Sequence, residues 1–156
     1  MSDMNVRPTS SADMPFLAEI VNETQLFPGE MLSEMASAFL GDADSDDIWL
    51  TCERAGEVIG FCYAVPEKLT DGTWNMLAIA VRPSHQGAGG GAAIVANLEA
   101  TLREMGHSIL IADTSGTAEF AQTRAFYRKN GYSEEARIRD FWSADNDKIV
   151  FWKKLN

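Results

Sequence analysis

A glycine-rich turn joins an apolar run to an amphipathic helix near the middle of the chain. The apolar run covers residues 76–81, and four of the five positions 87–91 are glycine. A turn this poor in side chains leaves backbone N–H groups bare, and the helix that follows adds the positive end of its dipole. Unpaired donors and a favourable dipole together bind phosphate. The sequence therefore predicts a site for a phosphate-bearing ligand at the start of this helix.

The composition is typical of one globular domain: 156 residues, 46% of them hydrophobic and 23% charged. A net charge of −10 argues against nucleic acid and anionic membranes as partners. No apolar run approaches the ~18 residues of a membrane helix, and the N-terminus lacks the basic and apolar regions of a signal peptide. Cys52 and Cys62 lie in strand-like segments, where buried free thiols are expected. We therefore expect a cytoplasmic protein without a metal site.

Turn residues and apolar periodicity predict the element order β α α β β β α β α β β. Strands are expected at 4–7, 48–54, 58–65, 73–81, 108–112, 132–142 and 148–154. Helices are expected on both sides of a break at 27–29, and again at 91–105 and 120–129. The helix at 91–105 should bury four apolar residues, Ile94, Leu98, Leu102 and Met105. It should also place strands 73–81 and 108–112 parallel. The prediction is an α+β domain with a mixed, mostly antiparallel central sheet and about four helices.

Three interpretations of the glycine turn compete. A plain flexible turn needs one or two glycines, not a cluster at a helix start. A dinucleotide-binding turn also fits, because residues 87–92 match G-x-G-x-x-A and Asp113 ends the next expected strand. Against it, residues 82–86 separate the strand from the first glycine, and antiparallel strands precede the motif. About 40 residues follow, too few for the remaining parallel strands.

Coenzyme A is the third interpretation, and two motifs support it. Residues 86–91 match Q/R-x-x-G-x-G/A, and residues 125–132 match an aromatic-Tyr-x-x-x-Gly-aromatic run. With these motifs in this order, the chain resembles the GNAT superfamily of acetyl-CoA-dependent N-acetyltransferases, as a single domain over residues 1–156. The resemblance implies transfer of an acetyl group from acetyl-CoA, as cosubstrate, to a primary amine by direct attack in a ternary complex.

The resemblance also implies where acetyl-CoA binds. In the superfamily, amides of the loop hold the pyrophosphate, the preceding strand pairs with the pantetheine arm beside a splay, and the helix of the second motif forms the other wall. Carried over, the cofactor-binding positions are Ile79, Ala80, Val81, Gln86, Gly87, Ala88, Gly89, Gly90, Gly91, Ala92, Thr123 and Arg124. One position departs from the pattern: seven residues before the tyrosine, the usual Asn is replaced by Phe120.

Tyr127, in the second motif, is the catalytic residue that the resemblance implies. Acetyl transfer needs a deprotonated amine, a donor to the tetrahedral oxyanion and a proton for the departing thiolate. Tyrosine hydroxyls ionise near pH 10 and thiols near 8.5, so a tyrosine can protonate the thiolate. A packed core tyrosine is the alternative interpretation. A backbone N–H near Val81 is the expected oxyanion donor.

The general base has no clear candidate in the sequence. Relatives often carry Glu or His on the strand before the loop, and the matching position is Asn75, which cannot take up a proton. His85 and His107 are typical of solvated loop and turn residues. Glu23 or Glu30 acting through water, or a water chain alone, remain as alternatives.

Six residues are expected to bind the acceptor: Glu23, Phe27, Trp74, Asn75, Phe141 and Trp142. Aromatic rings among them could surround an ammonium group, with core packing as the alternative. A small amine is the preferred acceptor. Residues 137–142 faintly resemble ribosomal-protein N-terminal acetyltransferases, so a peptide α-amine stays open. A non-catalytic acetyl-CoA sensor also stays open, because no base is evident. The sequence does not name the acceptor, the preferred acyl group or the oligomeric state, and a homodimer stays open.

Overall fold

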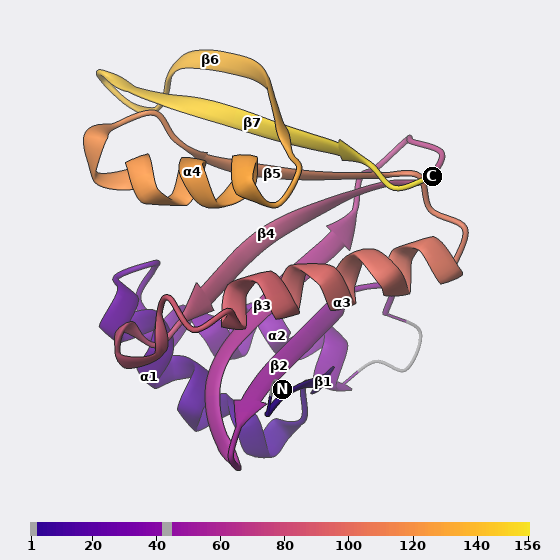
Figure 1. Ribbon diagram of the computed structural model, residues 1–156, viewed down its shortest axis with the longest axis vertical. Coiled ribbons are helices and arrows are strands. Elements are labelled where there is room, and N and C mark those ends of the chain that lie inside the picture. The colour runs from indigo at the N-terminus through magenta and orange to yellow at the C-terminus, as the bar shows by residue number, and fades with distance from the viewer. Residues whose placement is uncertain (1–2, 42–44) are drawn as a thin grey trace. The chain divides into compact units, whose positions relative to one another are not determined.

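Seven strands form one mixed sheet in the computed structural model, which describes residues 3–41 and 45–156 (Figure 1). Their order is β1 (Met4–Pro8), β2 (Ile48–Arg54), β3 (Glu57–Pro66), β4 (Thr73–Val81), β5 (Ile109–Ser115), β7 (Asn146–Lys154) and β6 (Ser133–Ser143). β4 and β5 pair in parallel, whereas the pairs β1–β2, β2–β3, β5–β7 and β6–β7 are antiparallel. The expected mixed, mostly antiparallel α+β fold is confirmed.

Four α-helices lie within the described residues: α1 (Met14–Thr24), α2 (Leu32–Gly41), α3 (Gly90–Glu104) and α4 (Ala121–Lys129). α3 is the crossover between the parallel strands β4 and β5, as the element order predicts. Ile94, Leu98 and Leu102 are buried as expected, but Met105 is 53% exposed. The helix ends at Glu104, and Gly106 takes a left-handed φ of +85°, so Met105 leaves the buried face of the helix.

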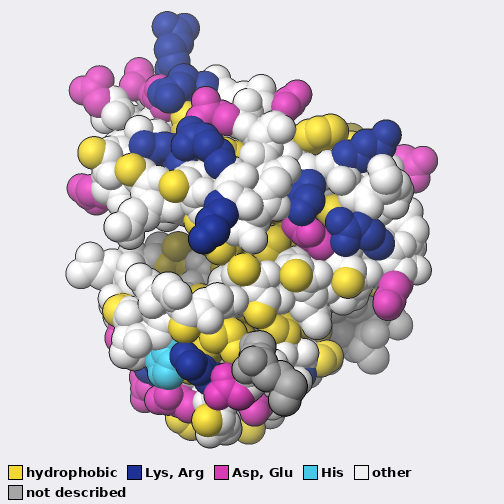
Figure 2. Space-filling view, in the orientation of Figure 1, with side chains coloured by type: hydrophobic (Ala, Val, Ile, Leu, Met, Phe, Trp, Pro, Cys, Tyr) yellow, Lys and Arg dark blue, Asp and Glu magenta, His cyan; other side chains and the backbone are white. Residues whose placement is uncertain are grey.

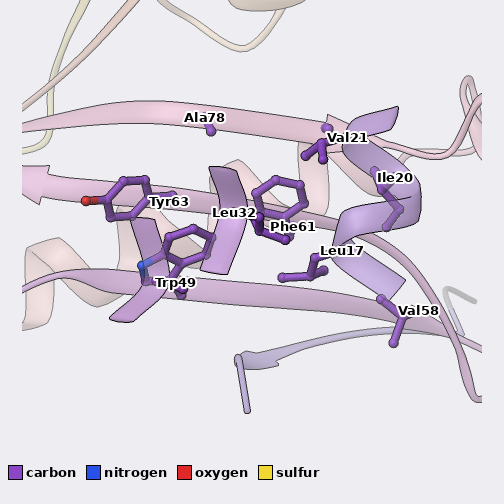
Figure 3. Close-up of a cluster of buried hydrophobic side chains, with 11 residues drawn as sticks. Leu17, Ile20, Val21, Leu32, Trp49, Val58, Phe61, Tyr63 and Ala78 are labelled. Carbon is purple, nitrogen blue, oxygen red and sulfur yellow. The ribbon is translucent and has the colours of Figure 1, made fainter. Parts of the chain in front are cut away.

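The chain divides into two compact units, and β4 contributes to both. The first unit contains residues 1–65 and 78–101, and the second contains residues 66–77 and 102–156. In the first, α1 and α2 pack on β2 and β3 around Trp49, whose ring stacks on Phe61 and Tyr63 (Figure 3). Leu17 and Leu32 bring the two helices into the same cluster. Burial of these large apolar side chains is the main term that stabilises the unit.

In the second unit, α4 lies along the β5–β7–β6 part of the sheet (Figure 1). β5 runs to Ser115, beyond the expected end at 112, because β7 pairs with it as far as the contact between Ser115 and Lys148. β6 is the edge strand, and all of its eleven residues are exposed. Its register shifts between Ile138 and Ser143, where Asp140 has a φ of +56°. The edge strand is therefore bent and carries none of the core.

A buried carboxylate fastens the N-terminal strand to the start of the first helical segment. Asp13, with 6% of its side chain exposed, accepts two hydrogen bonds from Arg7 and one from the Ser10 N–H. Arg7 also pairs with Glu53 on β2. The Arg7 guanidinium is the main cause that lowers the pKa of Asp13 from 3.8 to about 2. The charged form of Asp13 therefore stabilises the fold.

We expect Asp13→Asn to lower the free energy of unfolding by about 2 kcal/mol at pH 7. A carboxylate whose pKa falls on folding stabilises the protein above its unfolded pKa, and this contribution is lost as the pH falls from about 4 to 2. Urea denaturation at pH 7 and pH 2 measures it, with Asp71→Asn in an exposed loop as control. The two stabilities should nearly converge at pH 2, and an equal gap at both pH values would contradict the assignment.

Candidate active site

The glycine turn has the backbone geometry that its sequence predicts. Gly87 and Gly89 have φ of +84° and +95°, in the left-handed region that favours glycine. A Cβ at either position would meet nothing within 4 Å, so the turn is open on that side. Ala93 N–H donates to the Gly89 carbonyl at 3.0 Å, and the N–H groups of residues 90–92 lie ahead of this bond at the start of α3. They form the array of donors expected for a phosphate site.

Arg82 anchors the root of this turn within the first unit. Its N–H donates to the Ile59 carbonyl at 2.7 Å, and its side-chain Nε donates to the Val58 carbonyl at 2.9 Å. The guanidinium also pairs with Glu19 and Glu23 on α1. The buried arginine thereby ties the entrance of the turn to β3 and to α1. Arg82 was not among the predicted site residues, although the sequence places an arginine directly after an apolar strand.

Glu23 was expected near the acceptor as a proton relay. The ion pair with Arg82 holds its carboxylate at the root of the glycine turn. Glu30 is exposed in the short 3-10 turn that precedes α2. His85 contacts Glu57 through its Nε2 at 2.9 Å. Gln86 turns its amide back onto the Val81 carbonyl at 3.0 Å. These partners hold the side chains of the turn against their own unit.

Tyr127 lies in an aromatic cluster within the second unit. It is 3% exposed and packs against Phe126, Tyr132 and Phe151, with ring centroids 5.2 to 5.8 Å apart. Rings in these tilted and edge-on arrangements attract one another beyond simple burial of area. The tyrosine ring is therefore held in one place, which suits both a positioned acid and a core residue.

Helix α4 is joined to the end of β5 by Arg124. Its guanidinium donates to the carbonyls of Ser115 and Thr117, at 2.8 and 2.7 Å. Thr123 is half-buried. Phe120, at the position where the superfamily has Asn, is the N-cap residue of α4 without a side-chain cap hydrogen bond, and its ring is partly exposed. Arg124 thus has a structural partner, and the positions expected to touch the cofactor from α4 remain predictions.

The expected acceptor residues divide into packed and exposed groups. Phe27 packs against the core of the first unit, and Trp74 is buried against the His107 ring, 5.3 Å away. Phe141 and Trp142 are about half exposed and meet edge to face at 4.8 Å. Among the expected acceptor residues of the second unit, the exposed aromatic rings are therefore the two on β6.

Asn75 lies in a polar cluster with Glu67, Asp113 and Lys148, and the sequence did not predict that these residues come together. Its Nδ2 donates to Glu67 at 2.9 Å and lies 3.4 Å from Asp113 Oδ2. Lys148 Nζ lies 3.3 Å from the same Asp113 oxygen and 4.3 Å from the centre of the Phe141 ring. Asn75 interrupts the apolar run of β4, and Asp113 directly follows the apolar residues 109–112 of β5; this was the signal available in the sequence.

The described residues offer neither a cluster of metal ligands nor an exposed thiol. Within residues 3–41 and 45–156, no three His, Cys, Asp or Glu side chains are grouped as metal ligands. Burial raises the pKa of the Cys62 thiol to about 12, so it is a poor nucleophile at neutral pH.

No described helix is both long and apolar enough to span a bilayer. Acidic and basic side chains are intermixed over the face in Figure 2, and neither sign forms a continuous surface there.

A β-strand, a glycine turn and a helix with free N–H groups are typical of domains that bind a phosphorylated cofactor. Comparison with known families identifies the domain. A family model described as an acetyltransferase (GNAT) domain matches residues 44–134, more than half of the chain, and the protein therefore belongs to the GNAT acetyltransferase family. No curated protein matches its sequence.

Several solved structures share the fold of this protein over nearly its whole chain. A protein from Desulfovibrio desulfuricans, described as a member of the GNAT family, is 27% identical, with a TM-score of 0.90 over 98% of this chain and 99% of that one. An aminoglycoside 6'-N-acetyltransferase complexed with coenzyme A is 17% identical, with a TM-score of 0.81 and 97% of each chain covered. A ribosomal-protein-alanine N-acetyltransferase from Brucella melitensis is 22% identical, with a TM-score of 0.77 over 96% and 99% of the chains. The last two show a shared fold.

Proposed function

We propose that this protein transfers an acetyl group from acetyl-CoA to the primary amine of a small molecule. The observation that carries the proposal is the glycine turn, with its two left-handed glycines and the free N–H groups of residues 90–92. Membership of the family and the structural neighbour solved with coenzyme A support the same cofactor. The pyrophosphate binds the N–H groups of the turn, and residues 79–81 pair with the pantetheine arm.

The reaction joins the amine nitrogen to the thioester carbonyl and then breaks the carbon–sulfur bond. A backbone N–H near Val81 donates to the oxyanion of the tetrahedral intermediate. Tyr127 donates its proton to the departing thiolate, and the amine loses a proton to water or to a carboxylate through water. The products are an N-substituted acetamide and free coenzyme A.

Release of coenzyme A thiol with a panel of amines tests the proposal. Small aliphatic amines should support turnover well above the hydrolysis of acetyl-CoA alone. Turnover with peptide α-amines alone would instead favour the second candidate, a peptide N-terminal acetyltransferase, which residues 137–142 and the Brucella neighbour suggest. Calorimetric binding of acetyl-CoA without turnover of any amine would indicate a sensor. Absence of acetyl-CoA binding would contradict all three candidates.

The pH dependence of kcat/KM should show no histidine limb. Lysine-like amines are mostly protonated at neutral pH, so a reaction without a tuned side-chain base should accelerate up to the ionisation of the amine. It should decline at higher pH, when the acid group ionises. The measurement is a profile for the best acceptor in wild type and in His85→Ala. An acidic limb in the wild-type profile that the substitution removes would identify His85 as the base and contradict the prediction.

A further inference from the structure

Two neighbouring strands of the second unit hold buried oxygen atoms that have no hydrogen-bond partner. Among the described residues, three buried side-chain nitrogen or oxygen atoms lack a partner, and two of these are Asn75 Oδ1 and Asp113 Oδ1. An unsatisfied buried acceptor costs free energy, so native proteins seldom keep one without a reason. Two such atoms in one cluster indicate a place where a donor binds.

The strand register brings these side chains onto one face of the sheet. In the parallel pair β4–β5, Asn75 lies opposite Ile111, and Asp113 is two residues further along β5. Side chains two residues apart on a strand share a face. In the antiparallel pair β5–β7, Lys148 lies opposite Ser115 and therefore joins the same face. Three strands thus position the cluster, which is more precise than a loop could be.

The orientation of the Asn75 amide follows from its neighbours. Nδ2 faces the carboxylates of Glu67 and Asp113, both of which accept hydrogen bonds. An exchange of the amide nitrogen and oxygen would place Oδ1 against these two carboxylates, so the assignment is secure on hydrogen bonding. Asn75 is 5% exposed, and its Oδ1 is therefore an acceptor held within the cluster and not solvated.

The charges of the cluster favour a cation. Glu67 and Asp113 carry two negative charges, and Lys148 carries one positive charge, which leaves an excess of one negative charge. A primary ammonium group carries one positive charge and three N–H donors, and it matches both the charge and the two acceptors. The ammonium of Lys148, between the Asp113 carboxylate and the Phe141 ring, shows that the surroundings accept such a group.

We propose that Asn75 Oδ1 and Asp113 Oδ1 bind the ammonium group of the acceptor, an inference that rests on the proposed acetyl transfer. Both atoms lie below the protein surface, so a ligand reaches them when a neighbouring side chain rotates. Lys148 is a long, flexible side chain that is still 19% exposed, and the Phe141 ring next to it is half exposed. The preferred substrate is an amine without a carboxylate beside it, because a second anion would meet Glu67 and Asp113.

Alaninamide and alanine form a matched pair of probes, since they differ in whether a carboxylate lies next to the amine. We expect wild type to acetylate alaninamide with a KM at least tenfold below that for alanine. Asp113→Asn should raise the KM for alaninamide about tenfold to a hundredfold, the effect expected for loss of a hydrogen bond to a charged group. The difference in KM between alaninamide and alanine should therefore become smaller. Asn75→Ala should also raise KM, while acetyl-CoA affinity stays unchanged in both variants.

Asp145→Asn is the control, because it removes the same charge from an exposed turn and should leave KM unchanged. Thermal unfolding of every variant separates folding from binding. If Asp113→Asn and Asn75→Ala lower stability but leave KM unchanged, the two oxygens have a structural role, such as binding a buried water, and the inference is overturned.

A measurement without turnover separates this inference from the proposed function. Alaninamide alone should shift the NMR signals of the Asn75 side-chain amide in wild type but not in Asp113→Asn. If it does so, but no thiol is released with acetyl-CoA, the acetyl transfer fails and the cation site stands. If thiol is released and alaninamide causes no such shift, the cation site fails and the acetyl transfer stands.

Discussion

Tyr127→Phe should lower kcat by roughly 10²- to 10⁴-fold, the usual contribution of a positioned general acid. The substitution removes the hydroxyl and keeps the ring, which packs against Phe126, Tyr132 and Phe151. The ring should therefore stay in place and acetyl-CoA affinity should change little, because the aromatic contacts are preserved. Stopped-flow measurement of the chemical step, with acetyl-CoA saturating, isolates the effect from product release.

Tyr132→Phe is the matched control for this experiment. Tyr132 is buried to the same extent as Tyr127 and belongs to the same ring cluster, but the second motif assigns it no catalytic role. Its substitution should leave kcat within a few-fold of wild type. If Tyr127→Phe also retains wild-type kcat while chemistry limits turnover, Tyr127 is a packing residue.

Gly89→Val should weaken coenzyme A binding by roughly tenfold to a hundredfold or more. A β-branched residue at a φ of +95° costs about 1–3 kcal/mol of backbone strain, and each 1.4 kcal/mol corresponds to tenfold in affinity. The turn can relieve the strain by moving to another conformation, and binding must then restore the original one. We also expect the added side chain to hinder close approach of the pyrophosphate to the N–H groups proposed to bind it. Isothermal titration calorimetry with coenzyme A measures the loss.

Gly106→Val supplies the same strain at the other end of α3. Gly106 has a φ of +85°, and a Cβ there also meets nothing within 4 Å, as at Gly89. Both variants should therefore lose similar stability, whereas coenzyme A affinity should fall in Gly89→Val alone. An equal loss of affinity in both variants would indicate a general effect of destabilisation, and unchanged affinity in Gly89→Val would refute the turn as the pyrophosphate site.

Much of the fold could be predicted because local chemistry and tertiary packing agree along this chain. Gly106 ends α3 in a left-handed conformation, and the apolar positions of α3 up to Leu102 face inward as their spacing predicts. Met105 was assigned to the buried face because periodicity alone does not show where a helix stops. The length of β5 was underestimated for a related reason: its extension to Ser115 comes from pairing with β7, a long-range contact.

The candidate site was predictable where motifs carry backbone chemistry. Gly87 and Gly89 adopt the left-handed geometry that the cluster of glycines indicates. The partners of polar side chains were not predictable, because they depend on strand register. Asp113 was considered as the ribose acid of a dinucleotide fold, yet it lies in the cluster around Asn75. Arg82 likewise pairs with Glu19 and Glu23 on α1, which are far from it in the sequence, so these ion pairs depend on the tertiary fold.

The exposure of the edge strand β6 determines which substitutions this member of the family can tolerate. Substitutions on a strand without buried residues usually change stability by less than about 0.5 kcal/mol. Phe141 and Trp142, which we propose to contact the acceptor, lie on that strand. Mutation can therefore exchange these side chains, and with them the range of amines accepted, at little risk to the folded state. If the proposed function holds, we therefore expect acceptor preference to change more readily on mutation than cofactor binding at the glycine turn, which Arg82 ties to β3 and α1.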